Sequence, residues 1–294
     1  MKKIARSLLA VLLVLAMLGL CSCQQQNAAV AAIADAKKAA DLAGLKIAAQ
    51  AGTFHAKALG QITGVVSSTY PEFSDLLVAL KSGAIDGYIA EEPTALAVCL
   101  AENSLDYLHF KNNDTGFTAT DADVGIAVAV KKGSELKEKI NAVLAGISAD
   151  TRASLMEEMV KLSAGQTLTS LSLTSETPAS VNGTLRVAME CAYEPFNWTD
   201  TVSGGTLGAV PISGEGKNGL YANGYDIQIA KYVANKLGMA LEVYAIEWDS
   251  LLPALQAGTV DAIVAGMSPT EERAKEVDFS NVYYSSNLVV IYKK

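Results

Sequence analysis

The stretch LLVALKSGAIDGYIA at residues 76–90 recurs as LLPALQAGTVDAIVA at residues 251–265, and this repeat decides the fold. Each copy has an apolar run, then a glycine, then a short Ile/Val/Ala-rich run that follows an aspartate. The glycine is typical of the left-handed residue that ends a helix. The apolar run after it suits a strand that is buried on both faces. The repeat therefore predicts two related α/β lobes.

A second pair of segments supports this division of the chain. LKIAAQ at 45–50 and LRVAME at 185–190 are both strand-like and are both followed by turn-forming residues. Between the two halves, residues 167–175 are rich in Ser and Thr and lack charge until Glu176, which is typical of a linker. Ligands of such lobes bind where strands end and helices begin, so we expect a site in the cleft between them.

The first residues predict a secretory signal. A positively charged head precedes the unbroken apolar run at residues 8–20, and no stop signal of a spanning helix follows. LCSC at residues 20–23 resembles a bacterial lipobox. It implies that Cys23 is acylated and anchors the protein outside the cytoplasm, on the bacterial cell membrane. Cys21 is the second candidate, and an ordinary signal with two incidental cysteines is the alternative.

Composition excludes several classes of function. The net charge is −8 and no basic cluster is interleaved with aromatic residues, so no nucleic-acid partner is expected. Cys99 and Cys191 are too few for a disulfide framework, and we expect two free thiols in different lobes. No metal-ligand spacing is present. We expect neither a metal nor a cofactor.

The segment GMSPTEER at 266–273 carries the most chemistry. Ser268 and Glu271 form a capping-box pattern, and Pro269 suits the first position of a helix. Free N–H groups at such a helix start favour an anion, and Arg273 could close on a carboxylate with two N–H donors. The alternative is a surface helix whose arginine pairs with a neighbouring glutamate.

DAIVAGMSPTEERAKEVDFSNVYY at 261–284 resembles the signature of the polar amino-acid family of periplasmic binding proteins, bacterial solute-binding protein family 3. The resemblance extends over both lobes and implies an α/β, two-lobed periplasmic-binding-protein-like fold of type II. Residues 24–164, completed by a C-terminal strand at 286–294, correspond to the second lobe of that fold. Residues 165–183 form the linker, and residues 184–285 correspond to the first lobe.

The resemblance also implies site residues in the later half of the chain. Ser268 and Arg273 take the positions that bind the α-carboxylate of an amino acid, and Gly266 the position whose carbonyl accepts from the α-amino group. The segment around Glu190 and Tyr193 resembles the first strand and turn of the family, where an acidic residue touches the ligand and an aromatic ring covers it. We expect Phe196 and Trp198 to pack in the core, and Trp248 to face the ring of Tyr193 across the ligand.

The earlier half supplies the other side of the expected cleft. Thr53 lies in a segment that resembles the family's glycine-threonine turn, where it could cap a helix and offer its amide to the carboxylate. Gln50 and then Phe54 are the predicted specificity contacts. Glu91 stands where most relatives have an aspartate that binds the ammonium, and the longer side chain leaves the ligand's size open. The alternative is that Glu91 is an exposed residue at a helix start.

The order of the lobes differs from that of the family. There, the chain passes from the first lobe into a strand of the second lobe and continues; here, that strand is residues 286–294 and its continuation begins near residue 40. Circular permutation explains this order, and an incomplete or fused sequence is the alternative. Permutation predicts that the C-terminal strand lies beside residues 123–130.

These observations predict a monomeric, non-enzymatic receptor that captures a zwitterionic amino acid between its lobes by hinge closure. It would deliver the free amino acid to the permease subunits of an ABC importer, and it would touch the membrane only through its lipid. One alternative is a dehydratase-like extracytoplasmic enzyme on the same fold, with His55 as the suspected general base. A sensory module is the other, although it would require a spanning helix and an output domain.

Overall fold

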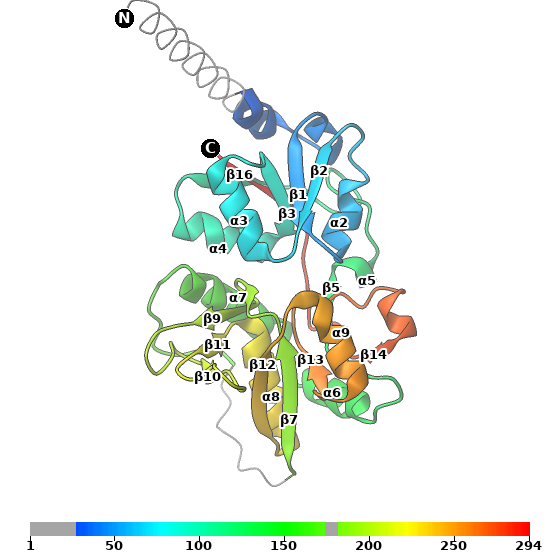
Figure 1. Ribbon diagram of the computed structural model, residues 1–294, viewed down its shortest axis with the longest axis vertical. Coiled ribbons are helices and arrows are strands. Elements are labelled where there is room, and N and C mark those ends of the chain that lie inside the picture. Colours follow the sequence, from blue (N-terminus) through cyan, green and yellow to red (C-terminus); the bar gives the residue numbers. More distant parts are fainter. Residues whose placement is uncertain (1–27, 174–181) are drawn as a thin grey trace, which may run out of the picture.

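The computed structural model describes residues 28–173 and 182–294, which form two α/β lobes stacked along the long axis of the molecule (Figure 1). The upper lobe in that view contains residues 28–124 and 287–294, and the lower lobe contains residues 127–173 and 182–283. Two short strands connect the lobes, β5 (Gly125–Ile126) and β15 (Tyr284–Ser285), and they pair with each other in antiparallel fashion. The expected α/β class is confirmed.

The upper lobe is built on a five-stranded sheet of order β2-β1-β3-β16-β4. β1 pairs in parallel with β2 and β3, whereas the C-terminal strand β16 pairs antiparallel with β3 and β4. Successive residues of a strand point to opposite faces, so Ile47 and Val290 face one apolar cluster, and Ala48 and Ile291 the other. The elements of this lobe are η1 (Ala39–Leu42), β1 (Lys46–Gln50), α2 (Phe54–Leu59), β2 (Val66–Tyr70), α3 (Phe73–Ser82), β3 (Gly87–Glu91), α4 (Glu92–Ala101), β4 (Leu105–Leu108), α5 (Asp121–Val124) and β16 (Leu288–Lys293).

The lower lobe contains a second five-stranded sheet, of order β12-β7-β13-β6-β14, and a four-stranded sheet, of order β10-β11-β9-β8. Its helices are α6 (Leu136–Leu144), α7 (Ala149–Ser163), α8 (Tyr225–Leu237), α9 (Trp248–Ala257) and the 3-10 turn η2 (Arg273–Lys275). Its strands are β6 (Ala129–Lys131), β7 (Thr184–Met189), β8 (Ala192–Tyr193), β9 (Asn197–Asp200), β10 (Val210–Pro211), β11 (Tyr221–Asn223), β12 (Ala240–Ala245), β13 (Ala262–Ile263) and β14 (Val277–Phe279).

The repeat found in the sequence forms the same unit in both lobes. α3 ends at Gly83 and α9 ends at Gly258, with φ angles of 76° and 78°. The left-handed conformation that the glycines predicted is therefore present at both helix ends. Each helix leads into a strand that pairs in parallel with a neighbour in its own sheet, β3 with β1 and β13 with β7.

Two expectations about the lobes are wrong. Residues up to 164 do not all belong to one lobe, because the buried strand β6 crosses over and pairs with β13 and β14. The C-terminal strand does not lie beside residues 123–130 either. It pairs with β3 and β4, because an apolar strand with two buried faces suits the middle of a sheet, whereas β5 pairs with β15 in the connection.

Other expectations concern the ends and the thiols. Cys99 and Cys191 are free, as predicted. The expected signal segment, Cys21 and Cys23 lie outside the described residues. Within residues 28–173 and 182–294, no helix is both long and apolar enough to cross a membrane.

Candidate functional site

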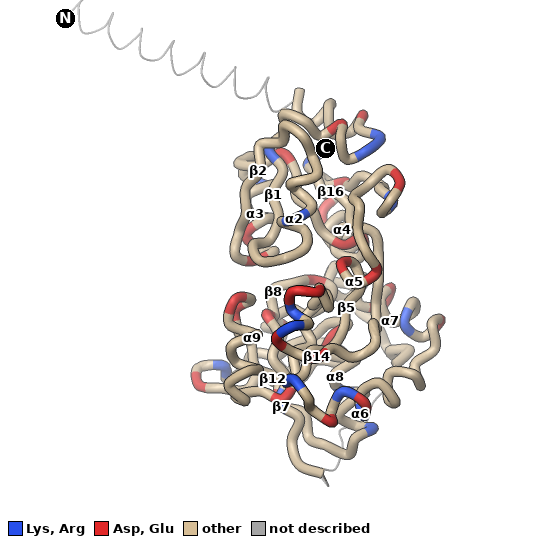
Figure 2. The backbone as a smooth tube through the Cα atoms, turned by 90° about the vertical axis from the view of Figure 1, so that its right-hand side faces the viewer, with Lys and Arg blue, Asp and Glu red and all other residues tan. Residues whose placement is uncertain are grey.

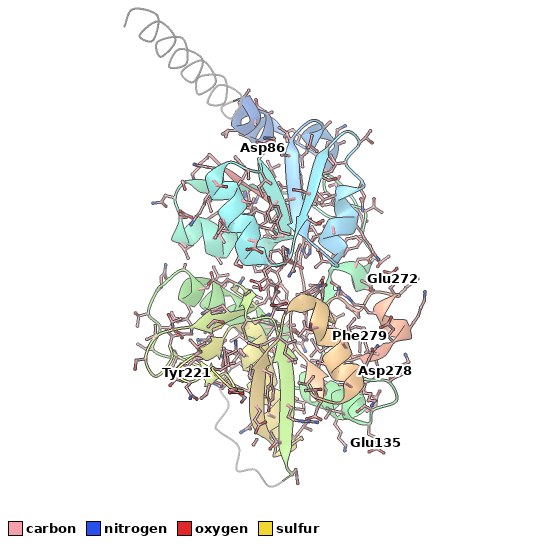
Figure 3. The ribbon with its side chains drawn as sticks, in the orientation of Figure 1. Asp86, Glu135, Tyr221, Glu272, Asp278 and Phe279 are labelled. Atoms are coloured by element: carbon pink, nitrogen blue, oxygen red, sulfur yellow. The ribbon has the colours of Figure 1, made fainter. Side chains whose placement is uncertain are left out.

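The predicted site residues come from both lobes and meet at the boundary between them. From the upper lobe come the end of β1, the start of α2 and the end of β3; from the lower lobe come the end of β7 and the turn after β13. Figure 2 shows acidic and basic positions close together at the top of the lower lobe. At this level Glu272, labelled in Figure 3, pairs with Lys57 of the upper lobe at 2.5 Å.

Arg273 is the basic residue at the centre of this boundary. Its Nη1 donates to the carbonyl of Ser268 and its Nη2 to the carbonyl of Gly52 in the upper lobe, both at 2.9 Å. The guanidinium carbon lies 5.1 Å from the ring centre of Trp248. Burial lowers the pKa of Arg273 to about 10, so the group is charged at neutral pH. Within the part of the chain that the structure describes, no carboxylate lies at ion-pair distance from it.

The helix predicted at Ser268 is absent from the described structure, and this prediction is wrong. Only the three-residue 3-10 turn η2 forms, because the chain must rejoin the sheet as β14 two residues later. The Ser268 hydroxyl donates to the carbonyl of Asp123 at 2.9 Å instead of capping a helix. The predicted helix dipole therefore cannot attract an anion here, and Arg273 is the cation of this turn that reaches the other lobe. The surface pairing considered for Arg273 is also not found, since Glu272 pairs with Lys57.

Glu190 is a buried carboxylate of the lower lobe, at the end of β7. It is 7% exposed and accepts a hydrogen bond of 2.7 Å from Gln50, which also donates to the carbonyl of Pro71. Desolvation raises the pKa of Glu190 to about 7 against the lowering effect of the Gln50 hydrogen bond. The nearby carboxylates of Glu72, Asp249 and Asp75 raise it further. This corner of the boundary is electronegative.

The aromatic contacts differ from those expected. Tyr193 stacks on Phe73 of the upper lobe, with ring centres 3.9 Å apart and planes at 11°, whereas Trp248 covers Arg273. The expected pairing of Tyr193 with Trp248 is therefore replaced by a pairing with Phe73. A signal for Phe73 existed in the sequence, because it follows the strand β2 whose end faces the cleft. Phe196 and Trp198 are buried in the core, as predicted.

Gly266 lies directly beneath Tyr193. Its φ of +61° is left-handed, and a Cβ atom there would approach Cε1 of the tyrosine ring to 3.0 Å. A side chain at this position would therefore displace the ring, and only glycine lets the backbone approach it.

The remaining predicted residues lie at helix starts of the upper lobe. Thr53 caps α2, as predicted, and accepts a long hydrogen bond of 3.4 Å from the Ala56 amide. Phe54 is half-buried and packs against the apolar cluster of its own lobe. Glu91 is 2% exposed, so the alternative of an exposed residue is wrong, and its Oε2 lies 2.9 Å from Nε2 of His55.

Several buried polar atoms at this boundary have no hydrogen-bond partner among the described residues. They are both ring nitrogens of His55, Oε2 of Glu91 and the hydroxyl of Tyr193. Leaving a buried donor or acceptor unsatisfied costs about 1–3 kcal/mol. Such atoms are typical of a site whose ligand supplies the missing partners. No metal-binding group of His, Cys, Asp and Glu occurs in the described ranges.

Comparisons with known proteins connect this site to a family. Residues 185–294 match bacterial extracellular solute-binding proteins, family 3. The arginine-binding extracellular protein ArtP of Bacillus subtilis is 44% identical over 80 residues, which are 27% of this chain and 31% of ArtP. The ABC transporter glutamine-binding protein GlnH of the same organism is 40% identical over 87 residues, 29% of this chain and 30% of GlnH.

Among solved structures, the ancestral amino acid-binding protein AncCDT-1, a precursor of cyclohexadienyl dehydratase, is 37% identical. The similarity covers 34% of this chain and 36% of that one, with a TM-score of 0.27. The chain thus spans about a third of the length of the curated relatives that it matches.

The raised pKa of Glu190 predicts a pH effect on stability. Because the folded pKa of about 7 exceeds the ordinary value of 4.5, folding takes up a proton between these values. The free energy of unfolding contributed by this group therefore falls as the pH rises through that range. We expect Glu190→Gln to raise the melting temperature above wild type at about pH 8 and to leave it unchanged at about pH 4.

Melting curves between these pH values measure the effect, with the exposed Glu138→Gln as the control. The pKa of buried Asp226 is also raised to about 7. Part of the dependence of the melting temperature on pH will therefore remain in every variant. A Glu190→Gln profile that runs parallel to wild type would contradict the prediction.

Proposed function

Since the chain carries, at residues 185–294, a region of the bacterial extracellular solute-binding proteins of family 3, we propose that it is the substrate-binding component of an ABC importer. It captures a free, zwitterionic amino acid between its two lobes. The observation that carries this proposal is Arg273, a charged and half-buried guanidinium that reaches the other lobe and has no carboxylate partner within residues 28–173 and 182–294. The ligand's carboxylate supplies that partner.

The carboxylate of the amino acid is proposed to bind between Arg273 and the start of α2. A guanidinium offers two parallel N–H donors to a carboxylate, and the backbone amide of Thr53 adds a donor from the upper lobe. Ser268 contributes if its hydroxyl turns away from the Asp123 carbonyl. Trp248 covers the guanidinium and limits its access to water, which strengthens the ion pair.

The ammonium of the amino acid is proposed to bind Glu91 and the carbonyl of Gly266. Glu91 is buried, and its Oε2 has no hydrogen-bond partner in the described part of the chain. A desolvated ammonium requires such an acceptor. Gly266 lies across the boundary, beneath the ring of Tyr193. The amine thus contacts one residue of each lobe.

The side chain of the amino acid is proposed to point toward Glu190, Gln50 and the stacked rings of Tyr193 and Phe73. Burial, and then the neighbouring carboxylates, raise the pKa of Glu190, and no cation pairs with it among the described residues. A cationic side chain would neutralise this charge, so we favour a basic amino acid. Phe54 packs against the apolar cluster of its own lobe, so it would affect the choice of side chain only indirectly.

Closure is proposed to occur about β5 and β15, the two strands that connect the lobes. A ligand that touches both lobes binds the closed state better than the open one, and it shifts the population by that difference. The closed monomer would then dock on the permease subunits. We further propose that acylated Cys23 holds the protein on the outer face of the bacterial cell membrane, as its only membrane contact.

One observation favours a second function, that of a dehydratase-like enzyme. His55 and Glu91 form a buried imidazole–carboxylate pair, which is the arrangement of a general base and its orienting group. Turnover would be detected by incubating the protein with amino acids and following new products by NMR. The binding role predicts that no product appears.

We also infer that the two lobes are circularly permuted relative to their relatives. The family match begins at residue 185, and the strand that follows its first lobe, β16, lies in the middle of the sheet formed by the earliest part of the chain. Both the C-terminal end and the first described residues lie at the upper end of the upper lobe (Figure 1).

A panel of amino acids tests the substrate class. A ligand at about 100 times its dissociation constant stabilises the folded state by about 2.7 kcal/mol, so we expect the melting temperature to rise with one or a few amino acids, the basic ones most. If none of the common amino acids raises it, the proposed substrate class is wrong.

Removal of the guanidinium tests the carboxylate site. We expect Arg273→Ala to abolish amino-acid binding in calorimetry, because a carboxylate would be buried without its cation, while the fold is retained. Lys275→Ala is the control, since Lys275 is an exposed cation of the same 3-10 turn. Equal affinities of Arg273→Ala and wild type would place the carboxylate elsewhere.

A rearranged chain tests the permutation. The chain would run from residue 182 to 294 and continue, through a flexible linker, from residue 28 to 173. We expect it to fold and to bind the same amino acid with similar affinity, because cuts and joins at exposed ends are tolerated. The control is a second circular permutant whose ends lie between the buried residues Val289 and Val290, inside β16. This control should not fold. Failure of both chains would contradict the permutation.

A further inference from the structure

His55 is a buried histidine that the proposed binding site leaves unused. It is the second residue of α2 and is 6% exposed. The Thr53 cap fixes the start of this helix, and it places the imidazole beside Glu91, where β3 ends and α4 begins. The imidazole and the ring of Phe73 also form a T-shaped contact, with ring centres 5.4 Å apart and planes at 89°.

The contact between His55 and Glu91 is close but does not satisfy either group. Nε2 of the imidazole lies 2.9 Å from Oε2 of the carboxylate, yet neither atom has a hydrogen bond of acceptable geometry within the described residues. Nδ1 is also unpartnered, as is the hydroxyl of Tyr193 from the lower lobe. An α-ammonium carries N–H donors in three directions, and a cluster of unsatisfied acceptors is what it requires.

We propose that His55 is a further residue of the amine subsite, whose neutral imidazole accepts an N–H of the ligand's ammonium beside Glu91. Protonated His55 takes the place of the ammonium as the cationic partner of Glu91 and so opposes binding. This inference rests on the proposed function. It makes the affinity for amino acids depend on the protonation of one side chain.

The charges around His55 support this exchange. Glu91 is the charged group in contact with it, and the pKa of Asp226 is raised mainly by burial and to a small extent by the charge of Glu91. Lys57 of the same helix is exposed and pairs with Glu272. Arg273 reaches Gly52, three residues before His55. An imidazolium would therefore neutralise Glu91 and add a second cation near Arg273, where an ammonium would be repelled.

Histidine is the side chain that changes charge near neutral pH. If only the neutral form binds, the apparent dissociation constant rises by the inverse of the neutral fraction. It should therefore increase as the pH falls from about 8 to about 5 and the neutral fraction of the imidazole shrinks. Ligand binding in that range should also release a proton.

Calorimetry between about pH 8 and about pH 5 tests this inference, with L-arginine and L-glutamine as probes. We expect His55→Gln to bind at about pH 8, because its amide oxygen is also an acceptor, and to lose the proton release and the pH dependence of wild type. His109→Gln is the matched control, since His109 is the other histidine and lies beside Tyr107 in the upper lobe. His55→Asn repeats the test if the glutamine variant does not fold.

Glu190 also gains a proton as the pH falls through this range, and this weakens the binding of a cationic side chain. The readout is therefore the difference in dissociation constant between wild type and the His55 variants at each pH. L-Glutamine, which has no charge on its side chain, gives that difference without this effect. Identical pH profiles of wild type and His55→Gln would overturn the inference and leave the proposed function intact. If wild type binds no amino acid even at about pH 8, the proposed function fails and this inference fails with it.

Discussion

The site depends on how the buried positive charge of Arg273 is compensated. The guanidinium is half-buried under Trp248 and spans the boundary between the lobes by donating to Gly52, yet it has no ion-pair partner among the described residues. Backbone carbonyls satisfy its hydrogen bonds without neutralising its charge. A buried charge of this kind is stable only if its surroundings or a bound anion compensate it. In the proposed function, binding of a carboxylate would thus be coupled to the approach of the two lobes.

The connection between the lobes is tied to the same site by a buried network. Tyr283, next to β15, donates a hydrogen bond of 2.6 Å to Asp226, and Asn197 donates one of 2.8 Å to the other oxygen of that carboxylate. Asn197 also accepts from the amide of Cys191, at the start of the turn that carries Tyr193. Tyr283, beside the connecting strand β15, is therefore linked through Asp226 and Asn197 to the turn that carries Tyr193.

Local signals in the sequence predicted local structure well, and pairings over long distances were harder to predict. Gly83, Gly258 and Thr53 act through the backbone of their own turns, so their conformations follow from residue type. The capping pattern at Ser268 failed because a non-local constraint, the return of the chain to β14, leaves no room for a helix. Likewise, β6 joins the lower sheet through partners distant in sequence, which no short pattern records.

The role of the Glu91 side chain is explained by its position at the start of α4. Glu91 is the N-cap of this helix, and a short acidic side chain there would bond the first free amides. The structure shows no such bond from the carboxylate of Glu91, and Pro93 has no N–H to donate. The longer side chain extends beyond the helix start to His55. Its charge remains available to a cation, whether that cation is a protein side chain or the ammonium of a ligand. In the proposed function, the ammonium of a ligand and the protonated imidazole of His55 would therefore compete for one buried carboxylate.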